Sequence, residues 1–308
     1  MIKKEQVAGF VFPNDIQGAI SAILVRHFFG SEIPVTFLSR RAISSEFVDK
    51  SSYAASNGLI YVFAGGQIPD ELIKNTNSGY LCVFNQECQS SKVNDRVVIL
   101  EGVSIPYLLY KVFSMDVPKP IMSLILMIER YYSGNNTSES LGLSLLYSKY
   151  FCENFSYRFR QGFDGFDAAE LNYISSEKRK MMNHFNSLSL WEGKWCGIPV
   201  LVHIGENKYP TETCYYMAGL NSKAYIVLSI GFDTESGSAR MTPSGISDLG
   251  SRGFHLGKFV SNINGTCLPR KWPEISGGGN STSAGFIFPN DEQINDFMTM
   301  GKFTQFIK

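Results

Sequence analysis

Short apolar runs separated by polar or glycine-containing segments fill the first half of the chain. Runs of this length bounded by turn residues are typical of strands in a parallel sheet covered on both faces. The predicted strands are Val7–Phe12, Val35–Leu38, Leu59–Phe63, Tyr80–Phe84 and Val97–Leu100. Apolar residues at helical spacing predict helices over Gly18–Phe29, Pro69–Lys74 and Ile105–Phe113. This alternation indicates an open βαβ sheet, in which ligands bind at the carboxyl ends of the strands.

The pattern then changes to helices and afterwards to a second α/β unit. Helices are predicted over 121–132, 138–151 and 168–185, with a Gly-, Phe- and Arg-rich connector over 156–167. Strands are predicted at 198–203, 224–231 and 286–288, and 291–307 fits a final amphipathic helix. We therefore expect a two-domain α/β protein: an N-terminal parallel-sheet domain over 1–155, a linker and connecting helix over 156–190, and a smaller α/β domain over 191–308.

Composition and charge limit the class of ligand. The chain has 308 residues, 44% of them hydrophobic, with 28 Lys plus Arg and 28 Asp plus Glu. Because the charges also balance within each half, there is no basic surface for long nucleic acid, and any nucleotide site must be a local pocket. The six cysteines form no Cys-x-x-Cys pair and are expected to be free thiols. No apolar stretch is long enough to span a bilayer. We expect a cytoplasmic protein of a bacterial or phage-infected cell, with no membrane partner.

Two motifs resemble the DHH/DHHA1 phosphoesterase superfamily. Phe10–Ala22 is similar to the first DHH motif, roughly His-x-Asp-x-Asp-Gly-x-x-Ser-Ala: Asp15, Gly18 and Ser21 match, whereas Pro13 and Gln17 replace a His and an Asp. The segment 277–286, Gly-Gly-Gly-Asn-Ser-Thr-Ser-Ala-Gly-Phe, resembles the DHHA1 signature Gly-Gly-Gly-His-x-x-Ala-Ala-Gly-Phe, with Asn in place of His. Its glycines are expected to form a loop ahead of the strand at 286–288. The two motifs stand in the order that the family requires.

The resemblance implies a hydrolytic centre of two divalent metals, most of whose ligands this sequence lacks. The Asp-His-His triplet is replaced by Asn-Gln-Glu at 85–87, and the acidic residue expected near Ala64–Gly66 is missing. The remaining metal-binding candidates are Asp15, Glu87 and Glu129. Three carboxylates without an imidazole fall short of a two-metal site. We expect no cofactor, or Mn²⁺ or Mg²⁺ if the protein is active.

The phosphate-binding half of the pattern is better preserved. Ser238–Met241 resembles the Ser-Leu-Arg-Ser segment of DHHA1 domains, whose arginine contacts substrate phosphate, so Arg240 is a candidate phosphate ligand. The other phosphate or nucleotide ligands that the resemblance implies are Gly277, Gly278, Gly279 and Asn280. An exposed strand arginine with no ligand is the alternative interpretation of Arg240.

Two further groups of residues are ambiguous. The connector aromatics, among them Tyr157, Phe159 and Phe163, either stack a nucleobase or pack the connector onto the domains. His27, within the first predicted helix, and His203, within a predicted strand, are expected to be packed structural residues.

We expect a catalytically degenerate DHH/DHHA1-like protein that binds a nucleotide or phosphate, or serves as a structural module. A phosphodiesterase with a reduced metal site, acting on short oligonucleotides or dinucleotides, is one alternative. A purely structural or assembly protein, for instance of a phage, is another. The expected partners are a small nucleotide or short oligonucleotide, and self-association into a homo-oligomer remains open.

Overall fold

The computed structural model divides into two compact units, residues 1–177 and 178–308. The residues that the structure describes are 4–39, 42–65, 68–76, 79–84, 95–99, 104–133, 137–206, 208–220, 222–231, 236–261, 277–279, 281–287, 298–299 and 302–306. Within these ranges no helix is both long and apolar enough to cross a bilayer. The narrower domain limits at 155 and 190 stay a prediction.

The first unit contains a five-stranded parallel sheet in the order β2-β1-β3-β4-β5. The strands are β1 (Val7–Pro13), β2 (Val35–Leu38), β3 (Ile60–Ala64), β4 (Tyr80–Phe84) and β5 (Val97–Ile99). The interior strand β1, between β2 and β3, is almost wholly buried because both faces of the sheet are covered. The parallel sheet predicted from the apolar runs is therefore confirmed.

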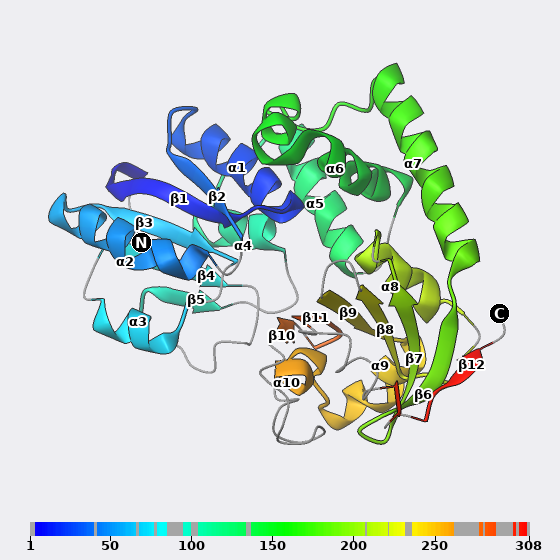
Figure 1. Ribbon diagram of the computed structural model, residues 1–308. Helices are drawn as coiled ribbons and strands as arrows, with labels where there is room; N and C mark the ends of the chain where they lie inside the picture. Colours follow the sequence, from blue (N-terminus) through cyan, green and yellow to red (C-terminus); the bar gives the residue numbers. More distant parts are fainter. Residues whose placement is uncertain are drawn as a thin grey trace. The chain divides into compact units, whose positions relative to one another are not determined.

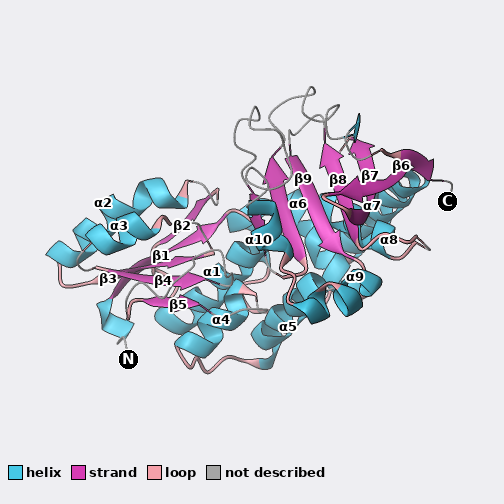
Figure 2. Cartoon of the chain, turned by 90° about the horizontal axis from the view of Figure 1, so that it is seen from below, coloured by secondary structure: helices cyan, strands magenta, loops and turns pink. Residues whose placement is uncertain are grey.

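Helices cover both faces of this sheet (Figure 2). The helical elements that precede residue 134 are the 3₁₀ turn η1 (Lys4–Gln6), α1 (Ile16–Phe29), α2 (Ile43–Ser56), α3 (Asp70–Asn75), α4 (Ile105–Val112) and α5 (Lys119–Ser133). Helices α2 and α3 lie on one face, where Phe47 of α2 packs edge-on against Phe63 and Tyr80 at ring-centroid distances of 5.0 and 5.1 Å. Helices α1 and α4 lie on the other face. The sequence pattern did not predict α2, because few of its residues are large and apolar and several are serines.

Two long helices, α6 (Ser138–Arg158) and α7 (Ala168–Ser187), follow. Helix α6 is kinked at Phe151, whose backbone has φ 55° and ψ 176°. Most connector aromatics pack onto one another after the kink, with successive ring-centroid distances of 4.8, 6.2 and 5.0 Å along Phe155, Phe159, Phe163 and Phe166. Tyr157 is different: its side chain is 69% exposed and lies under Arg160. The packing interpretation therefore holds for the phenylalanines.

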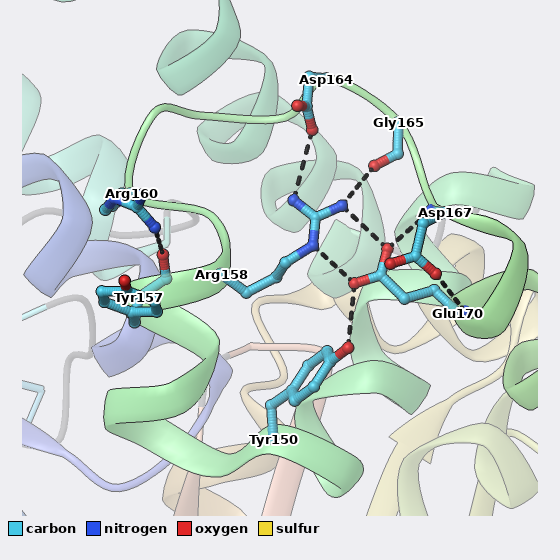
Figure 3. Close-up of polar contacts among 8 residues, drawn as sticks. All are labelled: Tyr150, Tyr157, Arg158, Arg160, Asp164, Gly165, Asp167 and Glu170. Atoms are coloured by element: carbon cyan, nitrogen blue, oxygen red, sulfur yellow. Dashed lines mark hydrogen bonds and ion pairs between the residues drawn. The ribbon is translucent and has the colours of Figure 1, made fainter.

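A buried ion pair fixes the start of α7 to the end of α6 (Figure 3). Arg158 donates two hydrogen bonds, of 2.7 and 2.9 Å, to the two carboxylate oxygens of Glu170, and Tyr150 donates a third. Glu170 also accepts the backbone N–H of Asp167 at 2.9 Å, while the Asp167 side chain accepts the Glu170 N–H at 2.8 Å. This reciprocal pair is a capping box that begins α7.

The second unit contains a seven-stranded sheet in the order β10-β11-β9-β8-β7-β6-β12, in which only β7 and β8 are parallel (Figure 1). Its strands are β6 (Leu190–Trp195), β7 (Ile198–Gly205), β8 (Ile226–Gly231), β9 (Ser236–Met241), β10 (Gly277–Gly279), β11 (Ser283–Ile287) and β12 (Thr304–Phe306). Cys196 and Gly197 join β6 to β7 with φ 51° and 82°, as a two-residue type I′ hairpin requires.

The helices of this unit cover opposite faces of the sheet. They are α8 (Pro210–Ala218), α9 (Pro243–Asp248), the 3₁₀ turn η2 (Gly250–Arg252) and α10 (Leu256–Ser261). The main core lies on the α10 side, where Leu256 and Val260 pack with Trp195, Ala239 and Phe286. Helix α8 packs on the other side of β8 and β9, and the Cys214 thiol donates to the Ser238 carbonyl at 3.4 Å.

Four of the expectations about local structure and bonding are wrong. Gly277–Gly279 forms a paired strand instead of a loop, and Thr304–Phe306 is a strand inside the predicted final helix. Both results come from pairing with distant strands, which local periodicity does not encode. Cys196 is disulfide-bonded, whereas Cys82, Cys152 and Cys214 are free. His27 is exposed on α1, while His203 is buried as expected.

Candidate functional site

The strand order of the first unit identifies one candidate site. The chain passes from β1 outward to β2 and then crosses to β3 on the other side of β1. A ligand crevice in an open α/β sheet lies at such a switch point, outside the carboxyl ends of the two strands. Asp15 follows β1 and Gly65 follows β3, so both predicted positions lie at this edge.

Asp15 is the N-cap of α1. Its Oδ1 accepts the backbone N–H of Gly18 at 3.0 Å, which satisfies one of the free donors of the first helical turn. Gly18 is needed here because a Cβ would lie 1.9 Å from the Pro13 carbonyl oxygen. The matches to Asp15 and Gly18 therefore have a structural reason in the tight passage from strand to helix.

Gln17 and Glu129 hold the start of α4. The side-chain oxygen of Gln17, which is 4% exposed, accepts the Ile105 N–H at 2.9 Å. A carboxylate oxygen of Glu129 accepts the N–H of Ser104, the N-cap of α4. Both polar side chains are thus bonded to backbone donors at a helix N-terminus, where an acceptor or a negative charge is favoured.

The backbone at the end of β3 favours glycine. Gly65 has φ 72°, a conformation that a residue with a side chain adopts only with strain. A Cβ there would also lie 2.0 Å from Cδ1 of Ile105, so the end of that side chain would have to move. The missing acidic side chain near this position therefore has a conformational reason.

The described residues at this edge do not by themselves make a two-metal centre. Glu87 lies outside the described residues, and Asp15 and Glu129 each accept a backbone N–H. Across the described ranges no three His, Cys, Asp or Glu side chains gather in a way that would hold a metal ion. We derive no catalytic step through a metal here.

A Tyr147–Cys152 pair, which no motif indicates, lies within electrostatic reach of Asp15. The Tyr147 hydroxyl and the Cys152 sulfur are 3.2 Å apart across the kink at Phe151. Burial raises the pKa of both groups, the hydrogen bond between them raises that of Tyr147 further, and the negative charge of Asp15 adds to both shifts. A thiol with a raised pKa is protonated at neutral pH, so Cys152 is not an activated nucleophile.

A second candidate site lies on the seven-stranded sheet around Arg240. Ala239 and Met241 of β9 and Ala284 and Phe286 of β11 point into the core, so Arg240 and the residues opposite it point to the other face. Arg240 is paired with Ser283 of β11. Its guanidinium lies over the ring of Tyr215 from α8, 4.0 Å from the centroid.

The glycines bring bare backbone to this same face. Gly278 pairs with Gly285, which pairs with Ser238 of β9. This row lies two residues, about 7 Å along the strands, from the row of Arg240 and Ser283. Gly285 is exposed, and a Cβ there would approach no atom more closely than the Gly237 oxygen at 3.9 Å. Asn280 lies outside the described residues.

Arg240 enters none of the ion pairs found within the described residues. Arg240 stacks on the ring of Tyr215, hydrogen-bonds to the Tyr215 side chain, and acts electrostatically on Cys214, whose pKa burial raises to about 12. Burial also raises the pKa of Tyr215, and Arg240 opposes that shift. An arginine beside open backbone that pairs with no carboxylate of the described residues can bind an oxyanion ligand.

No family model matches this chain, and no curated protein matches its sequence. Two solved structures are similar over nearly their whole length. One is a pGpG-specific phosphodiesterase, PggH from Vibrio cholerae, at 10% identity and a TM-score of 0.48, covering 95% of this chain and 97% of the other. The second is an uncharacterized protein from Helicobacter pylori G27, at 11% identity and a TM-score of 0.32, covering 96% and 99%. At these TM-scores neither likeness assigns a family or a function.

Proposed function

We propose that this chain is a degenerate DHH/DHHA1-like protein that binds a small nucleotide or a related phosphate compound and does not carry out two-metal hydrolysis. The observation that carries the proposal is the position of Arg240 on the sheet face that the Gly278–Gly285 row leaves bare. A planar guanidinium next to uncovered backbone suits a phosphate group, because phosphate accepts parallel N–H bonds and needs close approach.

The polar groups of the first unit support the loss of hydrolysis. A two-metal site requires several carboxylates and imidazoles whose lone pairs are directed at the ions. Asp15 and Glu129 each accept a backbone N–H, which gives them a structural role that needs no cation, and Gly65, whose φ is positive, offers no side-chain ligand at the end of β3. The hydrogen bonds of Gln17 and Glu129 stabilise the start of α4 without a cation.

Calorimetric titration with a 5′-phosphorylated linear dinucleotide tests the binding. The wild-type protein is expected to bind it, and Arg240→Met is expected to lower the affinity about 10- to 100-fold, because a hydrogen bond to a charged group contributes about 1.5–3 kcal/mol. Arg252→Met is the matched control, since Arg252 is an exposed arginine already paired with Asp248 at 2.6 Å. Absence of binding by the wild type, or equal losses in the two variants, would contradict the proposal.

A turnover assay on the same dinucleotide with Mn²⁺ or Mg²⁺ tests the degeneracy. We expect no hydrolysis. Sustained turnover that Asp15→Ala abolishes would instead establish the reduced-metal phosphodiesterase. Protein that neither binds nor hydrolyses the dinucleotide would favour the purely structural role.

A further inference from the structure

Helix α8 holds an aromatic ring against Arg240. The guanidinium of Arg240 lies over the Tyr215 ring at 4.0 Å from the centroid, although the two residues are 25 positions apart in the chain. A guanidinium stacked on a ring uses one of its faces for the contact. Arg240 also hydrogen-bonds to the Tyr215 side chain, but a guanidinium has five N–H donors in its own plane, so others remain able to bind an oxyanion.

Helix α8 is firmly seated, so Tyr215 is a fixed support. The residues on either side of Tyr215 are anchored: the Cys214 thiol donates to the Ser238 carbonyl, and Tyr216 stacks on Phe185 at 4.7 Å with an interplanar angle of 12°. Met217 is fully buried. The hydrogen bond from Cys214 ties α8 to β9, the strand that carries Arg240.

We infer that Tyr215 is a positioning residue for phosphate binding: its ring holds the Arg240 guanidinium in one orientation beside the Gly278–Gly285 row before the ligand arrives. This inference rests on the proposed function, because it assigns a role within the same site. A free arginine side chain loses rotamer freedom when it binds, and a side chain that is already fixed loses less. The ring thus raises affinity without touching the phosphate.

Substitutions that keep or remove the ring test this role by dinucleotide calorimetry. Tyr215→Phe keeps the ring and is expected to bind within about twofold of wild type, whereas Tyr215→Leu is expected to bind about five- to tenfold more weakly, the size of a partly desolvated cation–π contact. In the Arg240→Met background, Tyr215→Leu should have no further effect, because the two residues act as one unit.

The chain offers a control at another cation-supporting ring. Lys149 lies over the ring of Tyr173 at 5.1 Å in the first unit. Tyr173→Leu removes such a ring at a place that the proposed site does not include. It should leave dinucleotide affinity unchanged.

Two more measurements keep the inference falsifiable if Tyr215→Leu folds poorly. Arg240→Lys keeps the positive charge but loses the planar stack, and it is expected to weaken binding at least as much as Tyr215→Leu. The Hε resonance of Arg240 in the ligand-free protein should be shifted upfield by the ring of Tyr215, and this shift needs no ligand.

The outcomes separate this inference from the proposed function. A wild-type protein that does not bind the dinucleotide contradicts the proposed function, whatever the Arg240 resonance shows. Binding that depends on Arg240 but is equal in wild type and Tyr215→Leu, or an Arg240 Hε resonance at its ordinary position, contradicts the positioning role alone.

Discussion

The carboxylate of Glu170 is fully buried, and its oxygens accept bonds from Arg158, Tyr150 and the Asp167 N–H. Removing it leaves Arg158 without its main partner and removes half of the capping box of α7. We expect Glu170→Ala to lower the free energy of unfolding by about 2–4 kcal/mol, measured by urea denaturation. This expected loss in the free energy of unfolding is smaller than for a fully buried ion pair, because the Arg158 side chain is 26% exposed.

The matched control for Glu170→Ala is Glu153→Ala. Glu153 also accepts two hydrogen bonds from an arginine, Arg26, at 2.7 and 2.9 Å, but its side chain is 57% exposed. An exposed pair contributes about 0–1 kcal/mol, so this variant should be nearly as stable as wild type. Equal losses in the two variants would show that burial does not set the importance of the Glu170 network.

Two buried thiols make the stability fall at high pH. Burial raises the pKa of Cys82 and Cys214 above the ordinary value of 9.0, to about 12 for Cys214. The protonated thiol is thus favoured by the folded state, so its contribution is complete below pH 9 and is lost as the pH rises from 9 towards the folded pKa. Each thiol adds a slope of up to about 1.4 kcal/mol per pH unit above pH 9.

Urea denaturation between pH 8 and pH 10.5 measures this slope. The variant Cys82→Ala/Cys214→Ala is expected to lose stability at every pH through its smaller core side chains, but to show a shallower decline above pH 9 than wild type. Because other groups titrate equally in both proteins, the difference in slope belongs to the thiols. Parallel declines would contradict this assignment.

At the scale of elements, two glycines in the sheet of the second unit differ in whether the fold would accept a side chain. A Cβ at Gly237 of β9 would lie 2.1 Å from the Phe286 ring in the core, whereas a Cβ at Gly285 of β11 would meet only the Gly237 oxygen at 3.9 Å. The fold therefore requires the first glycine and tolerates a side chain at the second. If this open face binds a phosphate compound, a side chain at position 285 would stand between the ligand and the backbone, which explains the glycine.

We expect Gly237→Ala and Gly285→Val to have opposite effects. Gly237→Ala should lower the free energy of unfolding by about 1–3 kcal/mol through overpacking. Gly285→Val should leave stability unchanged or slightly raised, since β-branched residues favour strands, and should lower dinucleotide affinity at least tenfold by covering the bare backbone. Thermal denaturation and calorimetry on both variants measure this. Unchanged affinity in Gly285→Val would show that the ligand does not use this face.

Elements of the first unit were predictable where the chain itself carries the signal. The apolar runs of β1, β3 and β4 are continuous, and the Asp15–Gly18 turn marks the start of α1. Helix α2 was missed although its buried described positions, Ile43, Phe47, Ser51 and Ala54, follow helical spacing, because only the first two are large apolar residues. Strand β12 was mistaken for helix because only its pairing with β6 makes it a strand.

The sequence allowed some residues of the candidate sites to be predicted, but not the contacts that these residues make. Arg240 and Asp15 stand in recognisable motifs, whereas Tyr215 is one of 15 tyrosines and has no motif. Gln17 reaches Ile105 across 88 positions, and Glu129 reaches Ser104 across 25. Hydrogen bonds over such separations depend on tertiary packing, so the structural use of these side chains follows only from the folded chain.

At the scale of the whole molecule, the proposed function assigns a different property to each unit: the first has lost two-metal hydrolysis, and the second binds the phosphate compound. The first has a βαβ sheet whose switch-point polar groups are bonded to backbone, and the second has a mainly antiparallel sheet with an arginine beside open glycines. If this division is correct, the folded state of the whole protein should be indifferent to divalent metals and should respond to a phosphate ligand.

A ligand that binds only the folded state stabilises it by about 2.7 kcal/mol at one hundred times its Kd. For a unit of this size that corresponds to a rise in Tm of about 5–10 °C. We expect 1 mM Mn²⁺, or EDTA, to change the Tm of the full chain by less than about 1 °C, and a saturating dinucleotide to raise it by several degrees without metal. A large rise with Mn²⁺ that Asp15→Ala removes would show that the carboxylates at the β1 edge still bind a cation, and would favour the reduced-metal phosphodiesterase over the binding protein.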